Sequence, residues 1–334
     1  MSKISKYKEN IYNFITTKSC FSNIIDKNLI KDFMETELCL FPIALSAIFS
    51  SQIKKNKAKS YNILHISSAI ILMTLVVVIN ENKQYYEEKY GEKNINKLKN
   101  QATIFIFEAV SQNMKTMENT FDLKSESDVK SLTKIKEKIS FFLHDKLLIL
   151  SEINVTDKKL KMKKSDIIKY KFIDKDILET KYKKLSRIEN EELIEYINNK
   201  YCVIGQCAFV LGWLMGINEA SQKTIDTIAK LGSSFGLLLK LTNDFNCLEN
   251  DIKNATNMTF NFVANCGIHE CFALFDEHKV KFVEGCMIND VYNGLVKELI
   301  EKLDTTFDSC LEHTENLELV SQYSSFISQK SKNK

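Results

Sequence analysis

Glycine and proline are scarce in this chain of 334 residues, which contains nine glycines and a single proline, Pro42. Average usage of about 7% and 5% would give roughly 23 and 17. A sheet protein needs turn residues about every 8–12 positions, and too few are present here. Collagen-like and proline-rich classes are excluded for the same reason. With 44% hydrophobic residues the chain can bury a large core, so the composition predicts an all-α protein of long helices.

A dominant charge is also missing, because 46 Lys and Arg residues face 43 Asp and Glu residues for a net charge of +3. Arg187 is the only arginine. Specific nucleic-acid readers depend on bidentate arginine contacts, so we expect no nucleic-acid partner. The nine cysteines lack the spacing of a disulfide framework, and residues 1–10 do not resemble a secretory signal. Both features favour reduced thiols and a cytoplasmic location.

The longest apolar run, residues 63–79, is interrupted by His65, Ser67, Ser68 and Thr74. A membrane span needs roughly 20 apolar residues, and this run is shorter. The same composition is typical of a helix buried at the centre of a bundle. We therefore expect no transmembrane span.

Apolar periodicity predicts helices along most of the chain, and no internal repeat divides it. We expect a single domain over residues 1–334. The lysine-rich residues 158–171 are expected to form a mobile loop, and residues 326–334 a disordered tail. The charged residues 80–92 are expected to form a turn, and residues 221–251 one long helix.

The segment that suggests chemistry is the polar end of that last helix. On one continuous helix Asn243, Cys247 and Asp251 lie four residues apart and share a face. Amide and carboxylate oxygens suit Mg²⁺, whose shell is usually completed by substrate phosphates. The sequence therefore predicts a metal site formed by Asn243, Asp244, Cys247 and Asp251. A solvated helix end would show the same pattern.

This segment resembles the second aspartate-rich helix of trans-isoprenyl diphosphate synthases, the polyprenyl synthetase family. Residues 235–240 are similar to the approach to that motif, and Asn243 and Asp244 stand at its aspartates. Residues 196–217 are similar to the helix whose Lys-Thr pair contacts the diphosphate, with Lys200 kept and a tyrosine replacing the threonine. The resemblance implies the isoprenoid synthase fold, a large helical bundle around a central cavity. It also implies Mg²⁺ as cofactor and a prenyl diphosphate as substrate.

The first aspartate motif is where the sequence departs from the family. Residues 64–70 resemble the approach to that motif, and by this alignment its aspartates fall on Leu72, Met73 and Val76. An aspartate-to-leucine change removes a Mg²⁺ ligand, so this motif is degenerate. The remaining candidate contacts to the diphosphate are three lysines: Lys200, Lys240 and Lys253. A lone lysine on a helix is also compatible with a simple solvated charge.

A second family resembles the same segment. Class I terpene cyclases carry an Asn-Asp-x-x-Ser/Thr-x-x-x-Glu motif there, and residues 243–251 are similar to it with cysteine and aspartate at the last two positions. The leading expectation is a divergent polyprenyl synthetase that binds an allylic prenyl diphosphate through Mg²⁺ for chain elongation. A terpene cyclase is one alternative.

The other alternative is a non-catalytic subunit, since heteromeric synthases of this family pair an active subunit with one that lacks aspartates. Whether the chain is an enzyme therefore stays open at this point. The resemblance also implies a homodimer, or a heterodimer with an active synthase subunit.

Overall fold

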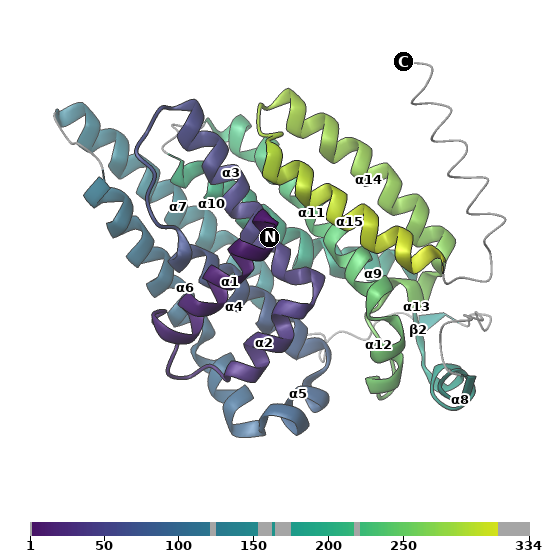
Figure 1. Ribbon diagram of the computed structural model, residues 1–334. Coiled ribbons are helices and arrows are strands. Elements are labelled where there is room, and N and C mark those ends of the chain that lie inside the picture. Colours follow the sequence, from purple (N-terminus) through teal and green to yellow (C-terminus); the bar gives the residue numbers. More distant parts are fainter. Residues whose placement is uncertain (1, 121–124, 153–161, 164–174, 217–220, 313–334) are drawn as a thin grey trace, which may run out of the picture.

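A computed structural model describes residues 2–120, 125–152, 162–163, 175–216 and 221–312 of the chain. Within these residues helices make up nearly all of the structure, so the all-α prediction is confirmed (Figure 1). The expected tail, 326–334, and the expected loop, 158–171 apart from 162–163, lie outside the described residues. The two short strands, β1 (Met162–Lys163) and β2 (Arg187–Ile188), pair antiparallel.

The helices in chain order are α1 (Lys3–Thr17), α2 (Lys27–Glu35), the 3₁₀ turn η1 (Glu37–Leu40), α3 (Phe41–Lys55), α4 (Leu64–Glu81), α5 (Lys83–Tyr90), α6 (Glu92–Thr120), α7 (Glu126–Glu152), α8 (Lys175–Thr180), the 3₁₀ turn η2 (Tyr182–Lys184), α9 (Asn190–Ile197), the π-helical turn η3 (Asn198–Cys202), α10 (Val203–Met215), α11 (Gln222–Asn246), α12 (Leu248–Asn254), α13 (Phe262–Cys266), α14 (Ile268–Ile288) and α15 (Gly294–Glu312).

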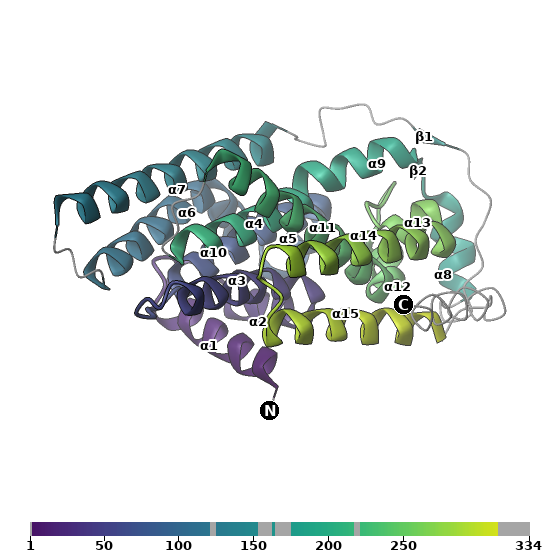
Figure 2. The ribbon, with the colours of Figure 1, turned by 90° about the horizontal axis from the view of Figure 1, so that it is seen from above.

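The centre of the bundle is the pair α10 and α11. Helices α3 and α7 pack on α10, while α14 and α15 pack on α11. Helices α6 and α7 lie at one end of the molecule, and α13 with β2 lies at the other (Figures 1 and 2). Glycine allows the central pair to cross closely, because a β-carbon on Gly205 would overlap the backbone carbonyl of Gly232. At this crossing the two backbones are in direct contact.

Helix α4 confirms the helix expected over residues 63–79, and its apolar side chains are almost all buried. By length and composition alone, α4 and the segment Glu37–Lys55 could each cross a membrane. However, 67% and 83% of their apolar windows are buried inside the protein, as in the core helices of a bundle.

The turn expected over residues 80–92 is wrong, because α5 occupies most of it. Its charged residues lie four apart and pair along the helix surface, as Lys83 and Glu87 do at 3.3 Å. Such pairs stabilise a surface helix that has little apolar periodicity. Gly91, with φ of 88°, ends the helix.

Candidate functional site

The polar end of α11 forms one wall of a cavity of about 180 Å³ between α2, α4, α5, α11 and α12. The single helix expected over 221–251 is wrong, because the chain breaks at Cys247 and restarts as α12. The side-chain amide of Asn261 donates to the backbone carbonyl of Asp244 at 2.6 Å and so occupies the acceptor that a continuing helix would use. The predicted residues Asn243, Asp244, Cys247 and Asp251 nevertheless all line this cavity.

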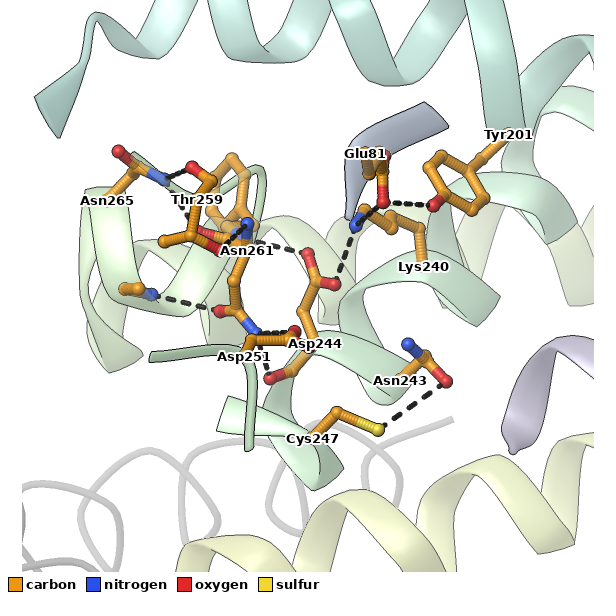
Figure 3. A network of polar contacts seen from close by, with 12 residues as sticks. Glu81, Tyr201, Lys240, Asn243, Asp244, Cys247, Asp251, Thr259, Asn261 and Asn265 are labelled. Atoms are coloured by element: carbon orange, nitrogen blue, oxygen red, sulfur yellow. Dashed lines mark hydrogen bonds and ion pairs between the residues drawn. The ribbon is translucent and has the colours of Figure 1, made fainter. Parts of the chain in front are cut away.

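The innermost contact of the cavity is an ion pair between two residues of α11. Lys240 Nζ lies 2.7 Å from Asp244 Oδ1 and 3.8 Å from Oε2 of Glu81, at the end of α4 (Figure 3). Lys240 is 3% exposed and Asp244 is fully buried. Burial lowers the pKa of Lys240, but the nearby carboxylates outweigh it, so the pKa is raised above its usual value.

Asp244 is held on both carboxylate oxygens. While Oδ1 contacts Lys240, Oδ2 accepts a hydrogen bond from the backbone N–H of Phe262 at 2.8 Å. Burial raises the pKa of Asp244 to about 7, and both of these contacts oppose that rise. Because the ammonium of Lys240 and the N–H of Phe262 each favour the carboxylate form, Asp244 is the acidic partner of Lys240 in this ion pair.

Glu81 completes the cluster from the opposite wall. The hydroxyl of Tyr201 donates to its Oε2 at 2.7 Å, and the ring of Tyr201 lies 4.5 Å from the ammonium of Lys240. A cation over an aromatic face is a favourable contact, especially where water is excluded. Reasoning from aspartate-motif spacing does not select Glu81, because it lies beyond the positions of the first motif. The only signal is an acidic residue two positions after a long apolar run.

Asp251 is held by a second residue that the sequence did not single out, Asn261. The Asn261 amide donates to Asp251 Oδ2 at 2.8 Å, and its carbonyl accepts from the N–H of Ala264, capping α13. Burial raises the pKa of Asp251 to about 6, and the hydrogen bond from Asn261 opposes that rise. An asparagine directly before a short apolar helix is the sequence signal that would have indicated this cap.

Asn243 and Cys247 face each other rather than the ion pair, with Cys247 Sγ 3.9 Å from Asn243 Oδ1 (Figure 3). Burial raises the pKa of the Cys247 thiol. A neutral thiol is a poor ligand for Mg²⁺, which prefers oxygen.

The donor set does not fit a Mg²⁺ cluster. The Asp244 carboxylate already holds the ammonium of Lys240 and a backbone N–H. On α4, Leu72 is fully buried, while Met73 and Val76 line a different cavity. Across the described ranges, no group of three or more His, Cys, Asp and Glu side chains is arranged to hold a metal ion.

The three predicted substrate lysines are not brought together. Lys240 lies in the ion pair, whereas Lys253 is exposed on α12. Lys200 lines a second cavity, of about 90 Å³, between α4, α6 and α7. Lys200 and Tyr201 are consecutive residues of the π-helical turn η3, and they line different cavities.

No protein-family model matches the chain, and a search of curated proteins finds no match either.

Proposed function

We propose that the chain is a non-catalytic relative of the isoprenoid synthases, which acts in the cytoplasm as a subunit paired with an active prenyl diphosphate synthase. The observation that carries this proposal is the buried ammonium of Lys240 among the carboxylates of Glu81 and Asp244. A diphosphate-cleaving site needs those carboxylates free to hold divalent cations. Here a side chain of the protein neutralises them. Within the described residues, Glu81 and Asp244 are the only carboxylates that contact Lys240. A metal ion bound to them would displace this buried lysine from both.

The small volumes of the cavity at the ion pair and of the cavity at Lys200 support the same proposal. Pockets that hold small organic ligands usually measure about 300–1,000 Å³. The cavity at the ion pair measures about 180 Å³ and the one at Lys200 about 90 Å³. Apolar side chains fill the positions at which the resembled families carry a metal-binding motif on α4. An extended prenyl chain would need these walls to move apart.

A Mg²⁺-dependent enzyme, either a chain-elongating synthase or a terpene cyclase, is the second candidate. It is favoured by the way in which Asn243, Asp244 and Asp251 gather with Glu81 around one cavity. It requires Lys240 to leave Asp244, turn toward a diphosphate and release the carboxylate to a metal ion.

A thermal-shift titration with a non-hydrolysable farnesyl diphosphate analogue, with and without Mg²⁺, separates the two candidates. A ligand at 100 times its dissociation constant stabilises by about 2.7 kcal/mol, which such a titration detects. We expect no Mg²⁺-dependent shift for this chain. A shift that requires Mg²⁺ and is lost in Asp244→Asn would overturn the non-catalytic proposal in favour of an enzyme.

The subunit role has its own test. The chain is mixed with a prenyl diphosphate synthase that has intact aspartate motifs and comes from the same genome. Mass is then measured by light scattering after size exclusion, and product length is measured by chromatography. We expect a mixed complex with an altered product distribution. If the two proteins elute separately at micromolar concentration and the products are unchanged, the pairing is refuted.

A further inference from the structure

The cavity at Lys200 combines apolar walls with a buried amine. Its lining residues come from α4, α6, α7, α9 and η3: Met73, Val76, Val77, Asn80, Lys99, Ala102, Thr103, Ile106, Leu147, Leu150, Ser151, Tyr196 and Lys200. Seven of these thirteen side chains are aliphatic or methionine, and the other six carry a polar group. On α6 and α7 the lining residues lie in the first half of α6 and in the last turns of α7.

Lys200 reaches this cavity with almost no access to bulk water. The residue is 4% exposed, and its Nζ donates a hydrogen bond to the backbone carbonyl of Leu150 at 2.5 Å. In the ranges that the structure describes, no carboxylate lies within ion-pair distance of Lys200. The nearest acidic influence is Glu81, which is already engaged by Lys240 and Tyr201. Among the residues described, the ammonium form is therefore buried without a countercharge.

Burial lowers the pKa of Lys200 to about 8, and the distant Glu81 carboxylate opposes this shift. The other titratable groups that face the cavity are Lys99 on α6 and Tyr196 on α9. Neither of these is an anion at neutral pH, so neither restores the charged form of Lys200. A pKa near 8 leaves a far larger share of the amine neutral at pH 7.4 than the usual lysine value of about 10.4 does. A desolvated lysine in an apolar pocket is the usual setting for an amine nucleophile.

We propose that Lys200 is a reactive amine that condenses with small apolar aldehydes admitted to the cavity between α4, α6 and α7. The Nζ lone pair attacks the carbonyl carbon and forms the N–C bond, and the carbonyl π electrons move to oxygen. That oxygen takes a proton from nitrogen to give a carbinolamine, which loses water to leave an imine. The balance is one amine and one aldehyde giving one imine and one water. No oxidant or metal is required.

The walls select the ligand class. Met73, Val76 and Ile106 favour a short aliphatic chain, and a cavity of about 90 Å³ admits only a few carbon atoms. The Leu150 carbonyl holds Nζ beside the last turn of α7. This inference concerns a different cavity from the ion pair and does not depend on the proposed subunit role.

The test is reductive trapping on the full chain. The protein is incubated with butanal and sodium cyanoborohydride at pH 7.4, digested, and mapped by mass spectrometry. We expect butylation at Lys200 to exceed that at the exposed Lys253 at least ten-fold, although Lys253 is far more accessible. The rate at Lys200 should rise with pH through a midpoint near 8. Equal labelling of Lys200 and Lys253, or stronger labelling of Lys253, would overturn the proposal.

Two variants sharpen the assignment. Lys200→Arg keeps a cation but cannot form the imine, so labelling of the peptide that contains position 200 should be lost. Lys97→Arg changes an exposed cation of α6 that does not line the cavity, and it should leave Lys200 labelling within about two-fold. The comparison of Lys200 with Lys253 in the wild-type protein decides the question even where a variant folds poorly. Loss of Lys200 labelling in Lys97→Arg with an unchanged circular dichroism spectrum would count against Lys200 as the reactive amine.

Discussion

Replacing Lys240 with methionine tests the ion pair in the cavity at the polar end of α11. Methionine keeps the length and most of the volume of the side chain but removes the charge. The variant leaves Asp244 fully buried and Glu81 7% exposed, with no cation beside either. Removing one partner of a buried ion pair costs about 3–5 kcal/mol, because an uncompensated charge remains.

The expected decrease in the melting temperature, Tm, follows from this loss of stability and from the length of the chain. Unfolding entropy is about 2.1 cal/mol/K per residue, so 334 residues give roughly 0.7 kcal/mol/K. The loss therefore corresponds to a decrease in Tm of about 4–7 °C, measured by circular dichroism at pH 7.5. Without Lys240, Asp244 has a folded-state pKa well above its unfolded value of about 3.9. The penalty should then grow as the pH rises from 5 to 8.

Lys253→Met is the matched control, because Lys253 is exposed on α12. Surface changes of this kind usually alter stability by less than about 0.5 kcal/mol. In Lys240→Met, millimolar Mg²⁺ should raise the Tm by a degree or more, because a divalent cation can replace the missing charge. The wild-type Tm should not respond. If Lys240→Met melts within 1 °C of wild type at pH 7.5, the ion pair does not hold the cavity together and the reasoning fails.

Three further predictions concern the surrounding structure. Gly205→Ala should lower the free energy of unfolding by about 1–3 kcal/mol or more in urea, because its β-carbon would meet backbone of α11. Gly294→Ala is the control and should be near neutral, since a β-carbon there meets only a lysine tip. Equal effects of the two substitutions would contradict the close crossing of α10 and α11. Asn261→Ala should lower the free energy of unfolding by about 2–4 kcal/mol, since the cap of α13 and the hydrogen bond to Asp251 are both lost. Asn246 is exposed, so Asn246→Ala should change the stability little. Burial raises the pKa of Asp251 from 3.8 to about 6, so this carboxyl contributes stability below about pH 4 that is lost as the pH rises through 6. Asp251→Asn should therefore gain about 1–3 kcal/mol relative to wild type between pH 4 and pH 7, and parallel stability profiles would refute that assignment.

The parts of the fold that local sequence determines were predictable. The apolar run 63–79 indicated a buried helix, and α4 occupies almost the same residues. Composition alone indicated the all-α class, because a sheet needs turn residues that this chain lacks. The sequence also indicated the polar end of α11 as a candidate site, and Asn243, Asp244, Cys247 and Asp251 line the cavity there.

What could not be predicted depends on partners that are distant in the sequence. The pairing of Lys240 with Asp244 lies within α11, but the position of Glu81 at the end of α4, which completes the cluster, depends on a segment distant in the sequence. The break at Cys247 depends on the side chain of Asn261, which arrives from beyond α12. Helix α5 was missed because pairs of charged residues, rather than apolar periodicity, stabilise it.

The π-helical turn at Asn198–Cys202 has a consequence for how this protein could change during evolution. A π turn contains one residue more than the regular helix around it, so a single deletion there can restore an ordinary α-helix without opening a gap. The deletion would therefore leave the helices on both sides of the turn in register. In most helices of this bundle a one-residue deletion would instead rotate one flank by about 100° and misalign an entire buried face. At this turn only the side chains of the turn itself would change place, among them Lys200 and Tyr201, which line the two cavities.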